Sequence, residues 1–162
     1  MPKITPFLWF DKEAEQAANY YTKIFKGSKI LAVARNTEST PGKKDSVLTV
    51  KFRIMGQVFT ALNGGPHYKF NNAVSFVVHC KTQAEVDYYW KKLSAGGEEI
   101  QCGWLKDKFG LVWQVVPDVL LELITSKDRA KANRVLGAMM KMVKLDIPKL
   151  QAAAKAPKIA RK

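Results

Sequence analysis

The hydrophobic pattern of the chain begins with a short strand followed by an amphipathic helix. The apolar run at residues 4–10 ends at Asp11, a residue type that caps helices. Residues 13–25 then place apolar side chains at the i, i+3, i+4 and i+7 positions of one helix face, and Gly27 follows where a left-handed C-terminal residue belongs. Three strands are predicted next, and the last two are joined by a tight turn at Met55-Gly56. They cover residues 29–36, 46–54 and 57–63.

The same order of elements then returns. An apolar strand covers residues 73–80, and Thr82 with Glu85 three residues later forms a capping-box pattern. The helix that follows ends at Gly96-Gly97, where glycine allows the chain to leave the helix. Three further short strands are predicted over residues 98–104, 105–108 and 111–116.

Direct comparison of the two halves indicates a duplication. Ala14 matches Ala84 and Gly27 matches Gly97 in one alignment, and IMGQVFTAL lies over KFGLVWQVV in another. The two alignments differ in offset because the first copy has the longer loop, Thr37–Asp45. We therefore predict one two-module domain over residues 1–126, with βαβββ modules at about 1–66 and 70–117.

A helical segment follows the second module. Ser126 is placed to cap a helix whose apolar stripe contains Ala132, Val135, Leu136, Met139 and Val143. Asp146 with Pro148 marks a second helix start. We predict a C-terminal helical extension over 127–156 and a disordered basic tail over 157–162.

Composition changes this picture little, but charge adds a feature. The 162 residues are 47% hydrophobic and 25% charged, the mixture of a globular domain. The net charge is +13, and residues 127–162 hold eleven Lys and Arg against two Asp. Such a basic region attracts nucleic acid or anionic surfaces. No aromatic residue follows Trp113 to stack on bases, so we favour a solvated helix face over nucleic-acid binding.

The N-terminal residues and the cysteines indicate a cytoplasmic protein. The chain has no signal-peptide pattern and no apolar run long enough to cross a membrane, so we predict no membrane association. Its two cysteines, Cys80 and Cys102, are expected as free thiols. Cys80 precedes the Thr82 cap by two residues, which would lower the pKa of a nucleophilic thiol. We favour the alternative, a small buried apolar side chain.

Several phrases of the sequence resemble a known family. They are ITPFLWFD, ALNGGP with Lys69-Phe70, SFVVHC, Glu85-Val86-Asp87 with Trp90 and Leu93, CGWLKD, and WQVVP. Together with the duplicated order they resemble the PhnB-like family, also labelled 3-demethylubiquinone 3-methyltransferase-like, of the glyoxalase or vicinal-oxygen-chelate superfamily. The resemblance implies an α+β fold in which tandem βαβββ modules form a cupped mixed sheet.

The resemblance also indicates where metal enzymes of the superfamily hold a divalent ion. The corresponding positions here are near Thr5 and Ala73, and at Thr60 and Gln114. None supplies an imidazole or a carboxylate, the ligands that offset the lost hydration of such an ion. We therefore predict no metal and no cofactor. The two imidazoles, His67 and His79, lack metal-ligand spacing and are expected to be structural or solvated.

Aromatic and polar residues on the predicted strands favour a ligand-binding cleft. We expect its ligand-binding residues to be Phe7, Trp9, Phe59, Asn63, Trp104, Lys106 and Gln114. Trp113 and Gln114 are neighbours on one strand, so only one of them faces the cleft. No glycine-rich turn joins a strand to a helix, which argues against a nucleotide-like methyl donor.

The sequence therefore predicts metal-independent binding of a small, partly apolar molecule. Two alternatives stay open: a glyoxalase-type enzyme (lyase, dioxygenase or transferase) with an atypical site, and a polyanion-binding adaptor that uses the basic C-terminus. A homodimer is expected, because Met139, Met140 and Met142 offer apolar surface.

Overall fold

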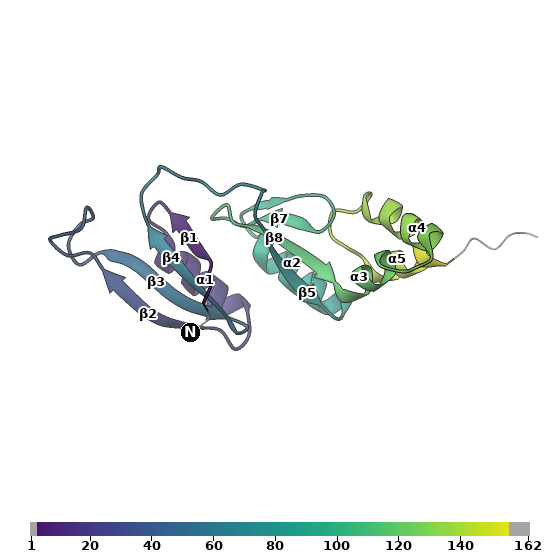
Figure 1. The fold of residues 1–162 in the computed structure, drawn as a ribbon, viewed down its shortest axis with the longest axis horizontal. Coiled ribbons are helices and arrows are strands. Elements are labelled where there is room, and N and C mark those ends of the chain that lie inside the picture. The colour runs from purple at the N-terminus through teal and green to yellow at the C-terminus, as the bar shows by residue number, and fades with distance from the viewer. Residues whose placement is uncertain (1–2, 156–162) are drawn as a thin grey trace, which may run out of the picture. The chain divides into compact units, whose positions relative to one another are not determined.

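A computed structural model describes residues 3–155 of the chain, so the predicted tail at 157–162 lies outside the described residues. The fold is α+β, with two four-stranded mixed sheets and five helices among the described residues (Figure 1). The chain divides into two compact units between Phe70 and Asn71. Each unit contains one βαβββ module, as the duplicated pattern predicts.

The first unit is a four-stranded sheet with one helix against it (Figure 1). The strands lie in the order β1-β4-β3-β2, with β1 parallel to β4 and the other pairs antiparallel. Its elements are β1 (Phe7–Phe10), α1 (Ala14–Ile24), β2 (Lys29–Arg35), β3 (Val47–Ile54) and β4 (Gln57–Asn63).

The second unit repeats this topology in the order β5-β8-β7-β6, again with its first and last strands parallel. Its module consists of β5 (Phe76–Cys80), α2 (Gln83–Ser94), β6 (Glu98–Glu99), β7 (Trp104–Lys106) and β8 (Val112–Pro117). Thr82 and Glu85 form the predicted capping box at the start of α2. Trp104 belongs to β7, whereas the sequence placed it at the end of the preceding strand.

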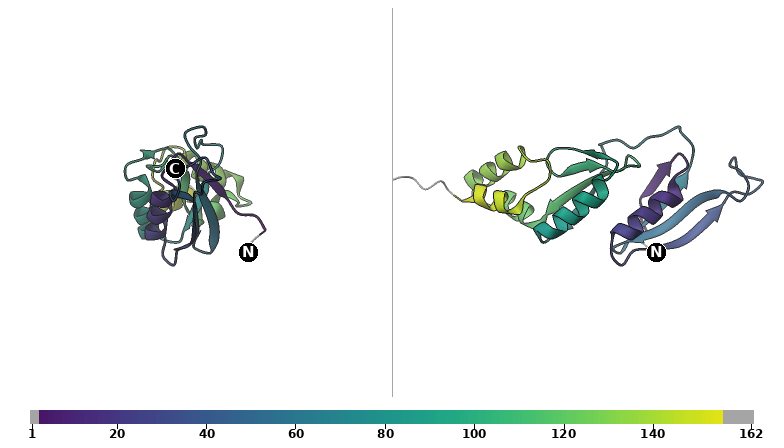
Figure 2. Two further views of the ribbon diagram at one scale, coloured as in Figure 1. Left: turned by 90° about the vertical axis from the view of Figure 1, so that its left-hand side faces the viewer. Right: turned by 180° about the vertical axis from the view of Figure 1, so that it is seen from behind.

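Three helices follow β8 and complete the second unit; Figure 2 shows them from behind. They are α3 (Asp118–Ile124), α4 (Arg129–Met139) and α5 (Ile147–Ala154). We call residues 118–155 the helical extension. Its core contains the buried residues Val116, Leu120, Val135, Leu145 and Leu150. The predicted apolar stripe is confirmed in part: Ala132 and Val135 are buried and Met139 packs against the core, whereas Leu136 is 38% exposed and Val143, after the end of α4, is 43% exposed.

The two faces of each sheet differ because strand side chains alternate. In the first unit, Tyr21 of α1 stacks on Phe52 with ring centroids 6.1 Å apart, and Phe52 stacks on Phe59 at 5.5 Å. Trp9 of β1 is in register with Leu62 of β4, and Leu62 is three residues after the core residue Phe59 on the same strand, so the two point to opposite faces. Their side chains therefore lie on the face away from α1, which we call the open face.

Three helix starts differ from the sequence-based expectation. Glu13, not Asp11, is the residue before α1, and its side chain forms no capping bond. Asp128 caps α4 by accepting a bond from the Lys131 amide, whereas Ser126 had been expected there. The short helix α3 was not predicted, because seven residues give too little periodicity to separate it from the end of β8.

None of the helices in residues 3–155 has the length and hydrophobicity that a membrane-crossing helix needs.

Candidate functional site

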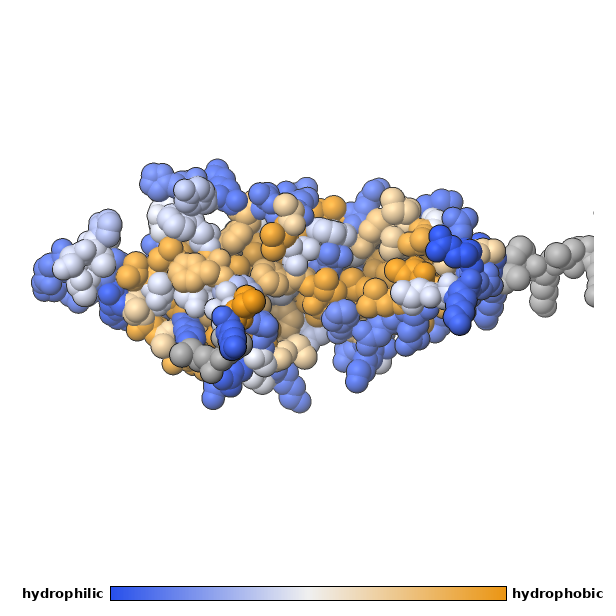
Figure 3. Space-filling model, in the orientation of Figure 1, coloured by the Kyte–Doolittle hydropathy of each residue, from blue (hydrophilic) through white to orange (hydrophobic). Residues whose placement is uncertain are grey.

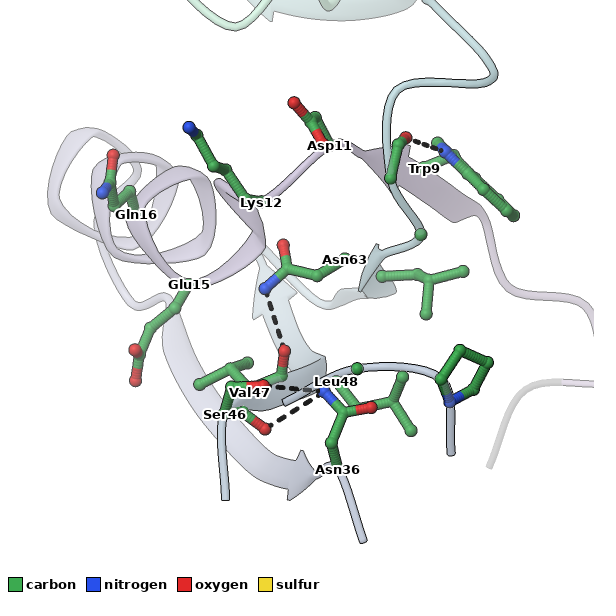
Figure 4. Close-up of a pocket in the computed structure, with 15 residues that line it drawn as sticks. Trp9, Asp11, Lys12, Glu15, Gln16, Asn36, Ser46, Val47, Leu48 and Asn63 are labelled. Atoms are coloured by element: carbon green, nitrogen blue, oxygen red, sulfur yellow. Dashed lines mark hydrogen bonds between the residues drawn. The ribbon is translucent and has the colours of Figure 1, made fainter. Parts of the chain in front are cut away.

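A cavity of about 700 Å³ lies within the first unit, next to the start of α1 and the end of β4 (Figure 4). Every residue that lines it belongs to the segment 9–65, so the first unit alone forms it. The lining residues are Trp9, Asp11, Lys12, Glu15, Gln16, Asn36, Pro41, Gly42, Ser46, Val47, Leu48, Leu62, Asn63, Gly64 and Gly65.

One wall of the cavity is the indole of Trp9. Its Nε1 donates to the Gly65 carbonyl at 2.8 Å, which fixes the ring plane. A Cβ atom at Gly64 would lie 2.3 Å from the indole Cε2, so only glycine allows the chain to pass this close. Tyr68 packs edge-to-face on the indole with centroids 5.0 Å apart. Trp9 is therefore held rigidly, as a binding wall requires.

Asn63 joins three elements at the edge of the cavity. Its Oδ1 accepts a bond from the Ala14 amide at 2.8 Å, and this satisfies a free N–H at the start of α1. Its Nδ2 donates to the Val47 carbonyl at 3.0 Å. Both ends of the amide are thus used within the protein, so Asn63 positions the cavity walls.

Asn36 contributes an acceptor that no described residue satisfies. The residue is only 5% exposed, and its Nδ2 donates to Ser46 Oγ at 3.0 Å. The Ser46 hydroxyl donates in turn to the Lys43 carbonyl, and this order fixes which end of the amide faces Ser46. The carboxamide oxygen of Asn36 points away from Ser46 (Figure 4) and accepts no bond from residues 3–155. A ligand donor at this point would satisfy it.

The mouth of the cavity is polar. Asp11 and Lys12 precede α1, and Glu15 and Gln16 lie in its first turn. Within the described part of the chain, the terminal groups of these four side chains form no hydrogen bond or ion pair. The lining at the mouth therefore includes two carboxylates and one ammonium group. In a chain of net charge +13, this is a locally acidic region.

The predicted site residues divide among three places. Trp9 and Asn63 line the cavity. Phe7 lies on the same open face as Trp9 but is 61% exposed and does not line the cavity. Phe59 is 4% exposed, stacks on Phe52 in the core beneath α1 and is not among the residues that line the cavity. The sequence does not show which of Val58 and Phe59 points toward α1, because both are apolar neighbours in β4 and both are buried.

Trp104, Lys106 and Gln114 lie in the second unit. Trp104 is in register with Gln114, and Lys106 with Val112, so all three share the face away from α2. Gln114 donates from Nε2 to Ser75 Oγ at 2.9 Å, and Lys106 lies 3.4 Å from a Glu98 carboxylate oxygen. Trp113 faces the opposite way, as predicted, and is 3% exposed. These three residues therefore share one face of the second unit's sheet, and none of them is a lining residue of the cavity described above.

Most of the cavity was missed from the sequence. Asn36 and Ser46 are brought together by closure of the loop 37–45, and residue periodicity carries no signal of such closure. Asp11, Glu15 and Gln16 resemble an ordinary polar helix start. The one sequence signal for this site is Gly64-Gly65 after a strand, because paired glycines mark a place where the backbone passes close to another group.

The residues at the superfamily's metal positions do not fit a divalent ion. Thr60 offers a neutral hydroxyl on the open face, and Gln114 offers an amide whose nitrogen is bonded to Ser75. Residues 3–155 contain no group of three or more His, Cys, Asp or Glu side chains that could hold a metal ion. His79 lies instead 3.4 Å from a carboxylate oxygen of Asp118.

Both cysteines are free thiols. Burial, followed by the charges of Glu85 and Asp118, raises the pKa of Cys80 to about 12. The surroundings at the start of α2 therefore raise the pKa of this thiol rather than lower it, and Cys80 is fully buried, as the favoured interpretation of a small buried side chain predicts. Cys102 is partly exposed, and its Sγ lies 3.7 Å from Met140 Sδ.

Comparisons with known proteins agree with the two repeated modules. A family model described as 3-demethylubiquinone-9 3-methyltransferase matches residues 2–116. The chain belongs to this family, the PhnB-like proteins. A PhnB protein from Bacillus cereus, described as a 3-demethylubiquinone-9 3-methyltransferase, is 34% identical with a TM-score of 0.66. The match covers 72% of this chain and 99% of that one. A search of curated proteins gave no match.

More distant structures share the glyoxalase fold. A protein from Pseudomonas aeruginosa is 18% identical with a TM-score of 0.62, and the match covers 72% of this chain and 98% of that one. The fosfomycin resistance protein FosX from Listeria monocytogenes is 14% identical with a TM-score of 0.51, and the match covers 75% and 97%. At these identities the PhnB-like chain shares the fold alone with them.

Proposed function

We propose that this PhnB-like protein binds a small, partly apolar organic molecule in the cavity of its first unit without a metal ion. The cavity volume of about 700 Å³ is in the range of small-molecule sites, roughly 300 to 1,000 Å³. Trp9, Val47, Leu48 and Leu62 supply apolar surface. The observation that carries the proposal is the carboxamide oxygen of Asn36 beside this surface, which accepts no hydrogen bond from residues 3–155 and remains open to solvent.

The polar groups favour a ligand with a hydrogen-bond donor. Asn36 Oδ1 and the carboxylates of Asp11 and Glu15 are acceptors, whereas Lys12 is the one cation among the lining residues. A protonated amine or a hydroxyl group satisfies such acceptors, and a carboxylate does not. An apolar body of one ring would pack against the indole of Trp9.

Three probes of similar size test this proposal: 2-phenylethylamine, 2-phenylethanol and 3-phenylpropionate. We expect calorimetric titration to give the order amine, alcohol, carboxylate, with at least tenfold between first and last. Leu48→Arg places a charge in the apolar wall and should weaken the amine at least tenfold. Leu121→Arg is the matched control, because Leu121 is 41% exposed and lies in the other unit. Equal effects of the two substitutions would contradict the proposal.

A further inference from the structure

The helical extension lies outside the part of the chain that matches the family. The family model ends at residue 116, and the Bacillus cereus protein is matched over 99% of its own length with only 72% of this chain. Residues 127–155 hold eight Lys and Arg but only two acidic residues, Asp128 and Asp146. The extension therefore adds a cationic surface to the family fold, in addition to any function of the cavity.

Specific contacts fix the extension on the second module. Gln83 of α2 donates from Nε2 to the Leu145 carbonyl at 3.2 Å, and its Oε1 accepts from the Ile147 amide at 2.8 Å. The amides of Cys102 and Gly103 donate to the carbonyls of Met142 and Val143, both at 2.8 Å. The cations of α4 and α5 thus stand on a rigid scaffold.

Three of the eight cations are used within the protein. Arg134 donates to the carbonyls of Ala153 and Ala154 at the end of α5, at 3.2 and 3.1 Å. Lys144 pairs with Asp87 at 2.5 Å, and Lys149 lies 3.8 Å from Asp146. The other five have no acidic partner among residues 3–155. They are Lys127, Arg129, Lys131, Lys141 and Lys155.

The exposed side of α4 carries a charge at its start. Arg129, Asn133 and Gly137 follow one another at intervals of four residues and are exposed, and the exposed Lys141 lies in the turn that follows the helix. The helix of eleven residues is about 16 Å long, roughly half a turn of double helix. Hydrophilic and hydrophobic residues lie side by side on the face of the second unit that Figure 3 shows.

We infer that the helical extension binds the phosphate backbone of double-stranded nucleic acid. Lys and Arg neutralise backbone phosphates without reading base sequence. Single strands are disfavoured, because no aromatic side chain follows Trp113 to stack on bases. A membrane surface is disfavoured, because the buried side chains of α4 pack on the extension's own core and no Trp or Tyr is present to anchor it. Met139 and Met142 also pack on that core, so only Met140 of the three methionines expected at a dimer interface is exposed.

Fluorescence anisotropy tests the inference with the full chain and a labelled 20-base-pair DNA duplex between 50 and 200 mM KCl. Five cations predict a slope of about −4.5 for log K against log salt. The variant Lys127→Gln, Arg129→Gln, Lys141→Gln should flatten the slope by roughly 3 and weaken binding at least tenfold at 50 mM. The control is Lys23→Gln, Lys26→Gln, Lys69→Gln, which removes the same charge from exposed lysines of the first unit.

Three results would overturn the inference: no duplex binding at 50 mM KCl, equal losses in the two triple variants, or binding to phosphatidylserine vesicles without binding to the duplex. An RNA duplex of the same sequence is titrated beside the DNA duplex, and the tighter of the two identifies which nucleic acid supplies the phosphates. The substituted side chains are outside the core, so equal melting temperatures of the variants are expected and verify that folding is intact.

Discussion

Single polar residues in this protein differ in whether the fold uses all of their hydrogen-bonding capacity. Asn63 uses both ends of its amide to join α1 and β3 to β4. Asp107, only 2% exposed, accepts bonds from two backbone amides and from the Trp113 indole. Asn36 is 5% exposed, and its carboxamide oxygen, beside the cavity, accepts no hydrogen bond from residues 3–155 and stays open to solvent. Burial alone therefore does not separate structural polar residues from candidate binding residues.

Asp107→Ala should destabilise the second unit. The substitution leaves the Phe109 and Leu111 amides and the Trp113 Nε1–H without their acceptor, all at 2.8 to 3.1 Å in the native protein. The expected cost is about 3 kcal/mol. Urea unfolding followed by tryptophan fluorescence measures it. Glu122→Ala, at an exposed carboxylate, is the control and should change stability by less than about 0.5 kcal/mol.

The two thiols should differ in reactivity. A pKa of about 12 leaves Cys80 protonated in the folded protein at pH 8, so an aromatic disulfide reagent should label one thiol per folded chain, at Cys102, and two after denaturation. The thiol of the unfolded chain loses its proton near pH 9, so this group makes the folded state less stable as pH rises above 9. Rapid labelling of Cys80 in folded protein would contradict the burial.

At the scale of elements, the sequence predicted the βαβββ order because strand alternation, helix periodicity and capping residues all repeat. It did not show that Phe59 rather than Val58 packs beneath α1, since both residues of β4 are buried. It missed the short helix α3. It also missed most of the cavity, which depends on contacts between segments distant in sequence, such as Asn36 with Ser46 and Trp9 with Gly65. Such contacts leave no periodic signal in either segment.

Gln83→Ala should loosen the attachment of the extension to α2. The change removes the two bonds to the backbone of residues 145–147, and we expect a loss of about 2 kcal/mol. Hydrogen exchange at the amides of α5 should then become faster, with α1 unchanged. Gln151→Ala, at an exposed position of α5, serves as the comparison. Unaltered exchange in the Gln83 variant would show that these two bonds do not hold the extension in place.

At the scale of the whole molecule, the family fold and the additions to it are separable. The two modules belong to the PhnB-like family, and the cavity lies within the first. The helical extension follows the matched region and carries five cations that have no acidic partner within residues 3–155. We propose that ligand binding and nucleic-acid binding are separate properties, so substitutions at either place should leave the other unchanged.

Chemical-shift mapping with 2-phenylethylamine tests the central claim most directly. We predict that the amine shifts the Trp9 indole N–H and the Asn36 side-chain amide, together with backbone amides of residues 11–16, 46–48 and 62–65. Amides of the second unit should not respond. Shifts confined to Trp104, Lys106 and Gln114, or the absence of any shift at 10-fold excess above the calorimetric Kd, would contradict a ligand site in the first unit.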